Sequence, residues 1–286
     1  MQLRPGTRPR RRSAMPGQNR PILYHFPLSP YSMRVRLVLA EKDIDWESRV
    51  VDIINMENYE PWYVSMCAHA EVPAFVRGDE VIVQSEQITR HLDASFPGQK
   101  LLPEDASFRR DVEGWVERAT RFPMESLHAA LSSPRQLRME SRLFGARIKA
   151  LRGFAKRRPD LESRYQAKID DIERKSALAS SPMPREEALA LVGAELDDLN
   201  NAFTSSEWIA GDAYSMADVF WTVALARLSM IGEADSFSAG HRPHLASWWQ
   251  RIRARPSFER ADIWLRMRPF SMAPYVFRLL RSWVTG

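Results

Sequence analysis

The 286-residue sequence contains a single cysteine, Cys67, which excludes an intramolecular disulfide and any zinc site built from several thiolates. This scarcity favours a reducing compartment, so we expect a cytoplasmic protein. No apolar run approaches the ~18 residues that a lipid-spanning helix needs. A glycine-rich phosphate loop is also missing, and the histidines are too scattered to suggest a metal site. What remains is a globular chain with enough apolar residues, 44%, to build a core.

Acidic residues are absent from residues 1–20, which carry six arginines and three prolines. Because this stretch has no apolar centre, it is not a secretory signal. We interpret it as a disordered basic arm, with Met15 as an alternative start and a targeting element as a third reading. The arm and residues 261–286 supply the basic excess behind the net charge of +5, and residues 21–260 are net negative. Nucleic-acid binding is therefore not expected.

Residues 21–98 read as a small α/β domain. A strand–helix–strand pattern comes first and predicts a parallel crossover, because such connections place the two strands in one sheet. An irregular stretch, residues 54–70, separates it from two apolar runs around Gly78-Asp79 that predict a hairpin, followed by a helix. The expected strands are 21–26, 46–53, 72–76 and 81–83, and the expected helices are 31–42 and 85–96.

Beyond Pro103 no strand pattern recurs, and the rest of the chain to residue 260 predicts an all-helical domain. Prolines at 182 and 184 interrupt it before one helix. The expected helices are 104–130, 135–157, 160–176, 185–203, 216–233 and 243–254.

Four local motifs in this order resemble the glutathione transferase superfamily. They are the stretch Leu-Tyr-His-Phe-Pro-Leu-Ser-Pro-Tyr-Ser-Met-Arg-Val-Arg at 23–36, Glu71-Val72-Pro73, Gln84-Ser85, and the capping box Ser215-Met-Ala-Asp218. The resemblance implies a thioredoxin-like glutathione-binding domain over 21–98 and a helical glutathione-transferase domain over 104–260. An extra segment at about 133–182 and an extension over 261–286 resemble the ganglioside-induced differentiation-associated protein branch, with stringent starvation protein A the next nearest.

The resemblance implies that Ser29 holds the thiolate of glutathione. A free thiol titrates near 8.5, so a hydroxyl donor and the positive end of a helix help to form the anion. Serine before proline is also a common helix cap, which is the structural alternative. Ser32 is an alternative donor, and Tyr24 is a third.

The same resemblance assigns the glutathione-binding residues. Glu71, Val72 and Pro73 match the family's cis-proline motif, whose backbone pairs with the cysteinyl unit of glutathione; an ordinary turn is the alternative. Gln84 and Ser85 match the pair that binds the γ-glutamyl group at a helix start, where Ser85 could instead be a simple cap.

Two residues depart from the family pattern, and the second substrate has only general candidates. Cys67 and Ala70 stand where the family usually has Asn and Gly; Ala70 could strain the turn, and Cys67 is expected to be packed inside. The electrophile is expected against the helix after Pro103. The candidates there are Trp115, Arg118, Phe122 and Met124.

The sequence thus predicts a dimeric glutathione transferase, homo- or heterodimeric, that detoxifies a hydrophobic, aromatic electrophile. Aryl ether cleavage is one specific possibility. The alternative is a non-catalytic binding or regulatory protein with the same fold. The amphipathic extension 261–286 is expected to cover the cleft, with peripheral membrane contact as its alternative.

Overall fold

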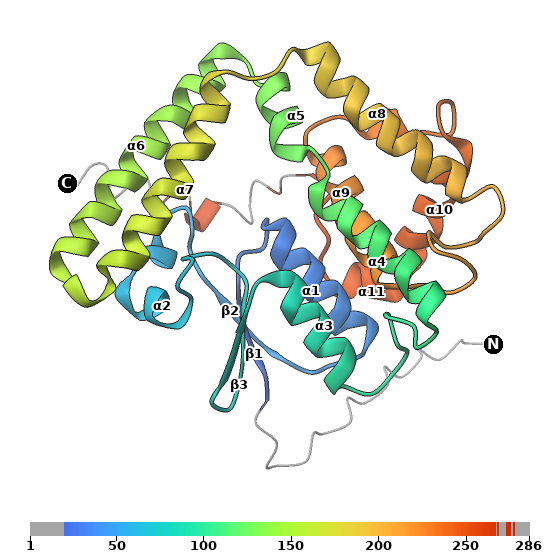
Figure 1. The fold of residues 1–286 in the computed structure, drawn as a ribbon, viewed down its shortest axis with the longest axis horizontal. Helices are drawn as coiled ribbons and strands as arrows, with labels where there is room; N and C mark the ends of the chain where they lie inside the picture. Colours follow the sequence, from blue (N-terminus) through green and yellow to red (C-terminus); the bar gives the residue numbers. More distant parts are fainter. Residues whose placement is uncertain (1–19, 267, 269–272, 276, 278–286) are drawn as a thin grey trace, which may run out of the picture.

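The computed structural model describes residues 20–266, 268, 273–275 and 277. A small sheet with its helices forms one part, and a larger all-helical part lies above it in Figure 1. Except for Arg20, the expected basic arm lies outside the described residues. Several residues of the expected amphipathic extension also lie outside them: Met267, Pro269, Phe270, Arg278, Leu279, Leu280, Arg281 and Trp283.

The sheet has four strands in the order β2-β1-β3-β4. β1 pairs in parallel with β2 and antiparallel with β3, so the predicted crossover through helix α1 is confirmed. Along β1 the side chains alternate: Leu23 and His25 are buried, whereas Tyr24 is half-buried. The elements are β1 (Ile22–His25), α1 (Pro30–Glu41), β2 (Glu47–Val50), β3 (Ala74–Arg77), β4 (Glu80–Val83) and α3 (Ser85–Ser95).

The stretch 54–70, expected to be irregular, contains a 3-10 turn, η1 (Glu57–Tyr59), and a short helix, α2 (Pro61–Met66). Pro61 occupies the first turn of α2, where its missing N–H is not needed, so it begins a helix instead of interrupting the chain. Tyr63 and Val64 bury their side chains and hold α2 against its surroundings.

The expected helix 104–130 is two helices. Phe122 has an extended ψ of 127°, and the break follows from Pro123, which disfavours a helical conformation in the residue before it. Helix α11 was not expected from the sequence. The helical part consists of α4 (Ala106–Arg121), α5 (Met124–Leu131), α6 (Pro134–Arg157), η2 (Pro159–Leu161), α7 (Glu162–Ser180), α8 (Arg185–Ala202), α9 (Met216–Met230), η3 (Ala234–Phe237), α10 (Pro243–Ala254) and α11 (Pro256–Arg260).

Helix α9 forms the centre of the helical part, and Asp218 fixes its start. The Asp218 carboxylate accepts hydrogen bonds from the backbone N–H of Ser215 (2.9 Å) and from Nε1 of Trp248 (2.8 Å). The predicted capping box is therefore confirmed as a folding element.

The extra segment forms an antiparallel pair of helices, α6 and α7, that extends beside the sheet domain (Figure 1). A separate buried cluster joins this pair to the 54–70 stretch, since Tyr59 and Ala70 pack with Leu151, Tyr165 and Ile169. The insertion is thereby anchored directly on the segment that leads to Val72-Pro73.

The described start of the C-terminal extension packs on the sheet domain. Trp264 is buried, and the Arg36 guanidinium donates to the carbonyls of Ala261 and Asp262. Further along, Tyr275 stacks edge-on against Phe26, with ring centres 5.5 Å apart. No helix among the described residues is long and apolar enough to cross a bilayer.

Candidate active site

Ser29 caps helix α1 and borders a cavity. It follows β1 and a short turn, and its Oγ accepts a hydrogen bond from the backbone N–H of Ser32 at 3.3 Å. The side chain is largely buried, at 7% exposure, yet it lines a cavity of about 330 Å³. Its hydroxyl proton donates to no acceptor in the described part of the chain. The capping alternative is therefore present in the structure, and it leaves the proton available to a ligand.

The two alternative donors lie elsewhere. Ser32 has no exposed surface, and its Oγ accepts a hydrogen bond from the backbone N–H of Phe26 at 3.4 Å, which closes the loop before α1. Tyr24 packs against the rings of Trp62 and Tyr63. Neither side chain lines the cavity beside Ser29.

The peptide bond between Val72 and Pro73 is cis, as the motif predicts, so the ordinary trans turn is excluded. Val72 borders both the cavity beside Ser29 and a smaller one of about 130 Å³. Its backbone N–H and C=O make no hydrogen bond with any residue that the structure describes. This edge can therefore pair with an extended peptide, as an added strand does.

Gln84 and Ser85 stand at the start of α3, but Ser85 is not the cap. Gln84 occupies the cap position with φ of 71° and makes no side-chain cap bond, and Ser85 is the first helical residue. Both line the smaller cavity, together with Val72 and Pro73. The free N–H groups of the first turn make this end of the cavity suited to a carboxylate.

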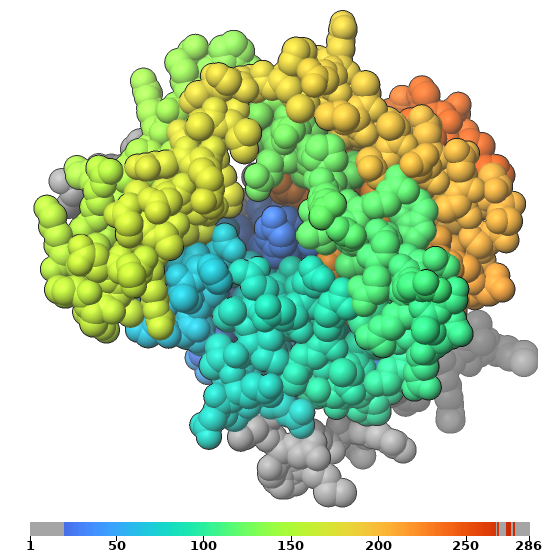
Figure 2. Space-filling model, viewed as in Figure 1, coloured from blue at the N-terminus to red at the C-terminus, as the bar shows by residue number. Residues whose placement is uncertain are grey.

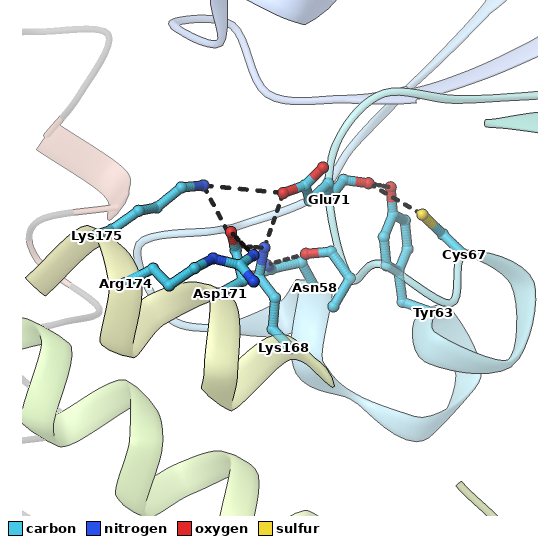
Figure 3. Close-up of polar contacts among 9 residues, drawn as sticks. Asn58, Tyr63, Cys67, Glu71, Lys168, Asp171, Arg174 and Lys175 are labelled. Atoms are coloured by element: carbon cyan, nitrogen blue, oxygen red, sulfur yellow. Dashed lines mark hydrogen bonds and ion pairs between the residues drawn. The ribbon is translucent and has the colours of Figure 1, made fainter. Parts of the chain in front are cut away.

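The backbone before Val72 is held by three polar side chains, all of them shown in Figure 3. The Tyr63 hydroxyl donates to the carbonyl of Glu71 at 2.7 Å, and Cys67 Sγ donates to the same carbonyl at 3.3 Å. Asn58 Nδ2 donates to the carbonyl of Ala70 at 2.7 Å. Cys67 is buried and its pKa is raised by burial, so it is a packed side chain, as expected.

Ala70 has the expected left-handed backbone, with φ of 50°. An alanine tolerates this region at a cost that glycine does not incur. Asn58 lies directly below, and its Oδ1 atom is buried with no hydrogen-bond partner among the described atoms. Because Asn58 borders the cavity beside Ser29, this oxygen is an available acceptor for a ligand N–H.

An ion-pair group from helix α7 lies beside Glu71, and no motif in the sequence predicts it. Lys168 Nζ lies 2.9 Å from Glu71 Oε1 and 3.0 Å from Asp171 Oδ2 (Figure 3). Burial acts to lower the pKa of Lys168, but the two carboxylates outweigh it, and the pKa is raised overall. Lys175 lies 3.2 Å from Asp171 and 4.0 Å from Glu71. The one sequence feature that could have indicated these residues is the extra segment at about 133–182, which contains them.

The space around these residues is a depression between the sheet domain and the helical part. In Figure 2 it opens between α7, α5 and the sheet domain, with the start of the chain's first helix, in blue, at its floor. The two cavities share Tyr31, Glu71 and Val72. A third, about 760 Å³ in volume, lies beside them and is lined by α5, α6, α7, the 181–183 turn and Arg227 of α9.

The four candidates for electrophile contacts lie away from the three cavities described above. Trp115 and Phe122 pack against Trp221 in the core, and Arg118 pairs with Glu195 and Asp198. Met124 packs on the main core as well. None of these four lines the three cavities. On α4, Trp115 points toward α9 and Arg118 toward α8, while helices α6 and α7 of the insertion supply the cavity wall.

Among the described residues, no group of three or more His, Cys, Asp or Glu side chains could hold a metal ion.

Comparison with known proteins agrees with this arrangement. Residues 23–100 match the glutathione S-transferase N-terminal domain and residues 178–256 match the C-terminal domain. Tetrachloro-p-hydroquinone reductive dehalogenase of Sphingobium chlorophenolicum is 32% identical over 243 residues, covering 84% of this chain and 95% of the relative. Human ganglioside-induced differentiation-associated protein 1-like 1 is 29% identical, covering 91% and 78%.

Solved structures show the same fold. The beta-etherase LigF of Sphingobium sp. strain SYK-6 superposes with a TM-score of 0.65 at 20% identity, covering 84% of this chain and 98% of that structure. With both domains matched in order and a relative that aligns over almost its whole length, the chain belongs to the glutathione S-transferase family, whose enzymes use glutathione as a co-substrate.

Proposed function

We propose that this glutathione S-transferase holds the thiolate of glutathione at Ser29 and transfers it to a hydrophobic, aromatic electrophile. The observation that carries the proposal is the bonding of the Ser29 hydroxyl. Its oxygen accepts from the N–H of Ser32, and its proton remains free to donate to sulfur beside the unpaired backbone of Val72. A donor to the anion and the positive end of α1 both lower a thiol pKa.

Three further residues support the placement of glutathione. Gln84 and Ser85, at the start of α3, suit the γ-glutamyl carboxylate, and the open edge at Val72 suits the cysteinyl unit. Glu71, Val72 and Pro73 then form one continuous wall that leads from this end toward Ser29.

The reaction follows from this placement. The thiol gives its proton to solvent, and the sulfur attacks the electrophilic carbon. The leaving group departs with the electron pair of its broken bond, whether it is a halide or an aryl oxide. An aromatic substrate is supported by the name of the dehalogenase relative, which acts on a hydroquinone. Cleavage of an aryl ether is one form of the same displacement.

A matched pair of serine variants tests the proposal. Ser133, like Ser29, is a cap followed by proline, and its Oγ accepts from Gln136 N–H at 3.3 Å. Each Ser→Ala change removes a cap and costs about 1 kcal/mol. We expect Ser29→Ala alone to raise the pKa of the bound thiol, measured by thiolate ultraviolet absorbance, and to reduce kcat by about tenfold or more.

The pair also separates the alternative function, a non-catalytic binding protein, which is supported by the capping role of Ser29 and the differentiation-associated relative. If Ser29→Ala and Ser133→Ala change the thiol pKa and kcat equally, the result favours the non-catalytic alternative. If the wild-type protein is not retained on glutathione-agarose, the proposed glutathione binding is wrong.

Quaternary structure and location belong to the proposal as well. We expect a dimer, homo- or heterodimeric, that works in detoxification in the cytoplasm, on the basis of the family resemblance and the unpaired Cys67. Light scattering of the purified chain tests the homodimer. For the extension 261–286 we favour packing over the cleft, because Tyr275 stacks on Phe26, which lines the cavity of Ser29.

A further inference from the structure

Two arginines stand where the cavity of Ser29 meets the large cavity. Arg147 comes from α6 and Arg227 from α9, and they are the residues that line both spaces. A molecule that reaches from Ser29 into the large cavity must therefore pass these two guanidinium groups.

Neither guanidinium has an ion-pair partner in the described part of the chain. Arg147 and Arg227 form no ion pair or hydrogen bond with any described residue, and Nε of Arg227 is buried without a partner. Burial lowers the pKa of Arg227, and the nearby Tyr31 and Glu125 offset this effect only in part. A partly buried cation without an ion-pair partner is stabilised by a bound anion, and both guanidinium groups are partly buried.

The other charges at the cavity are already paired or exposed. His128 Nε2 lies 2.8 Å from Glu140 Oε1, and Lys175 lies 3.2 Å from Asp171. Glu125 is exposed and forms no ion pair with Arg227 in the described structure. The remaining wall is largely apolar. It contains Leu143, Phe144, Leu178, Ala179, Pro182 and Met183.

We propose that the electrophile of this transferase carries a negatively charged group, a carboxylate or a phenolate, on an apolar body, and that Arg147 and Arg227 bind that group. The inference rests on the proposed function and names the substrate class of the same site. A guanidinium binds a carboxylate through parallel N–H donors, while the apolar wall of α6 and α7 accepts the rest of the molecule.

Two electrophiles that differ only in charge test this inference: 4-chloro-3,5-dinitrobenzoate and its amide, 4-chloro-3,5-dinitrobenzamide. In both, the thiolate sulfur forms a bond to the ring carbon, chloride leaves with the C–Cl electron pair, and the thiol proton goes to solvent. For the wild-type protein we compare two ratios: kcat/KM for the benzoate over kcat/KM for the amide, and the uncatalysed rate of the benzoate over that of the amide. We expect the first ratio to be about tenfold larger than the second.

Arg147→Met and Arg227→Met should each lower this benzoate preference by about tenfold and leave KM for glutathione unchanged. Arg227→Lys should retain part of it. Arg142, exposed on the same helix α6 and outside the cavity, provides the control, since Arg142→Met should change nothing. An unchanged preference in both Met variants overturns the proposal. A rise in KM for glutathione with both electrophiles also overturns it, because the arginines would then bind the carboxylate of glutathione.

A binding measurement separates this inference from the transferase function. Calorimetry with 3,5-dinitrobenzoate, which has no leaving group, should show binding by the wild-type protein that both Met variants lose. If the protein accelerates the reaction of neither electrophile with glutathione but binds 3,5-dinitrobenzoate, the transferase proposal fails and the anion site stands. If binding is absent or is the same in the Met variants, the anion site is wrong.

Discussion

The Nζ atom of Lys168 lies 2.9 Å from Oε1 of Glu71, the residue that precedes the cis Val72-Pro73 bond. This ion pair joins helix α7 of the insertion to the glutathione side of the cleft. Lys168 is almost wholly buried, whereas the Glu71 side chain keeps 41% of its surface exposed. The insertion therefore positions the wall against which the tripeptide is expected to lie.

Lys168→Met should loosen this wall. We expect the unfolding free energy to fall by about 1–2 kcal/mol, since Glu71 is left partly solvated and not fully buried. KM for glutathione should rise several-fold, with a smaller change in kcat. Lys149→Met, at an exposed site on α6, is the control. An unaltered KM for glutathione would show that the ion pair stabilises the packing of the insertion and does not position the glutathione-binding wall.

Gln84 combines an unfavourable backbone conformation with a position at the smaller cavity. Its φ of 71° is costly for a residue with a Cβ atom, so Gln84→Gly should raise the unfolding free energy by about 1 kcal/mol. The same change removes the amide and should raise KM for glutathione. Gln84→Ala keeps the backbone cost and loses the amide, so it should raise KM without the gain in stability. Denaturant titration and steady-state kinetics measure the two effects.

His25 should make the protein less stable in mild acid. Burial and the neighbouring Arg36 lower its pKa to about 3, from 6.5 in the unfolded chain. Between these values the unfolded state binds a proton that the folded state does not, so stability falls as the pH decreases. From pH 7 to pH 5 the loss is about 2 kcal/mol.

His25→Gln should remove this part of the pH dependence, because glutamine can replace both ring contacts, to Ser48 and to Arg36, without titrating. Asp218, whose pKa burial raises to about 6, acts in the opposite direction, so the comparison must be between variant and wild type at each pH. His244→Gln, at an exposed position, serves as the control. Parallel stability curves for His25→Gln and the wild type would contradict this account.

Asp218→Ala should lower the unfolding free energy without changing the activity of the folded protein. The change leaves the buried N–H groups of Ser215, Ile209 and Trp248 without their acceptor, at a cost of about 3 kcal/mol or more. Trp248→Phe removes one donor and should cost less. Activity per folded molecule should be unchanged in both variants, measured below the unfolding transition.

Local signals were sufficient for the elements that build the glutathione side. The apolar period and the Ser-Pro pair located α1, and Glu71-Val72-Pro73 predicted the cis bond through family resemblance. The prediction of an irregular stretch over 54–70 failed, because Pro61 begins helix α2 there. Ser85 is the first residue of α3 and not its cap, because Gln84 occupies the cap position with a φ of 71°. No local sequence rule predicts this left-handed conformation for glutamine.

The sequence by itself determined the order of the two domains and the capping of α1 and α9, because each depends on contacts between near neighbours in the chain. Only the tertiary structure decided what forms the other wall. Arg147 and Arg227 are 80 positions apart, and Lys168 is 97 positions from Glu71. Their meeting depends on how α6 and α7 pack on the 54–70 stretch, and no periodicity within one segment encodes that packing.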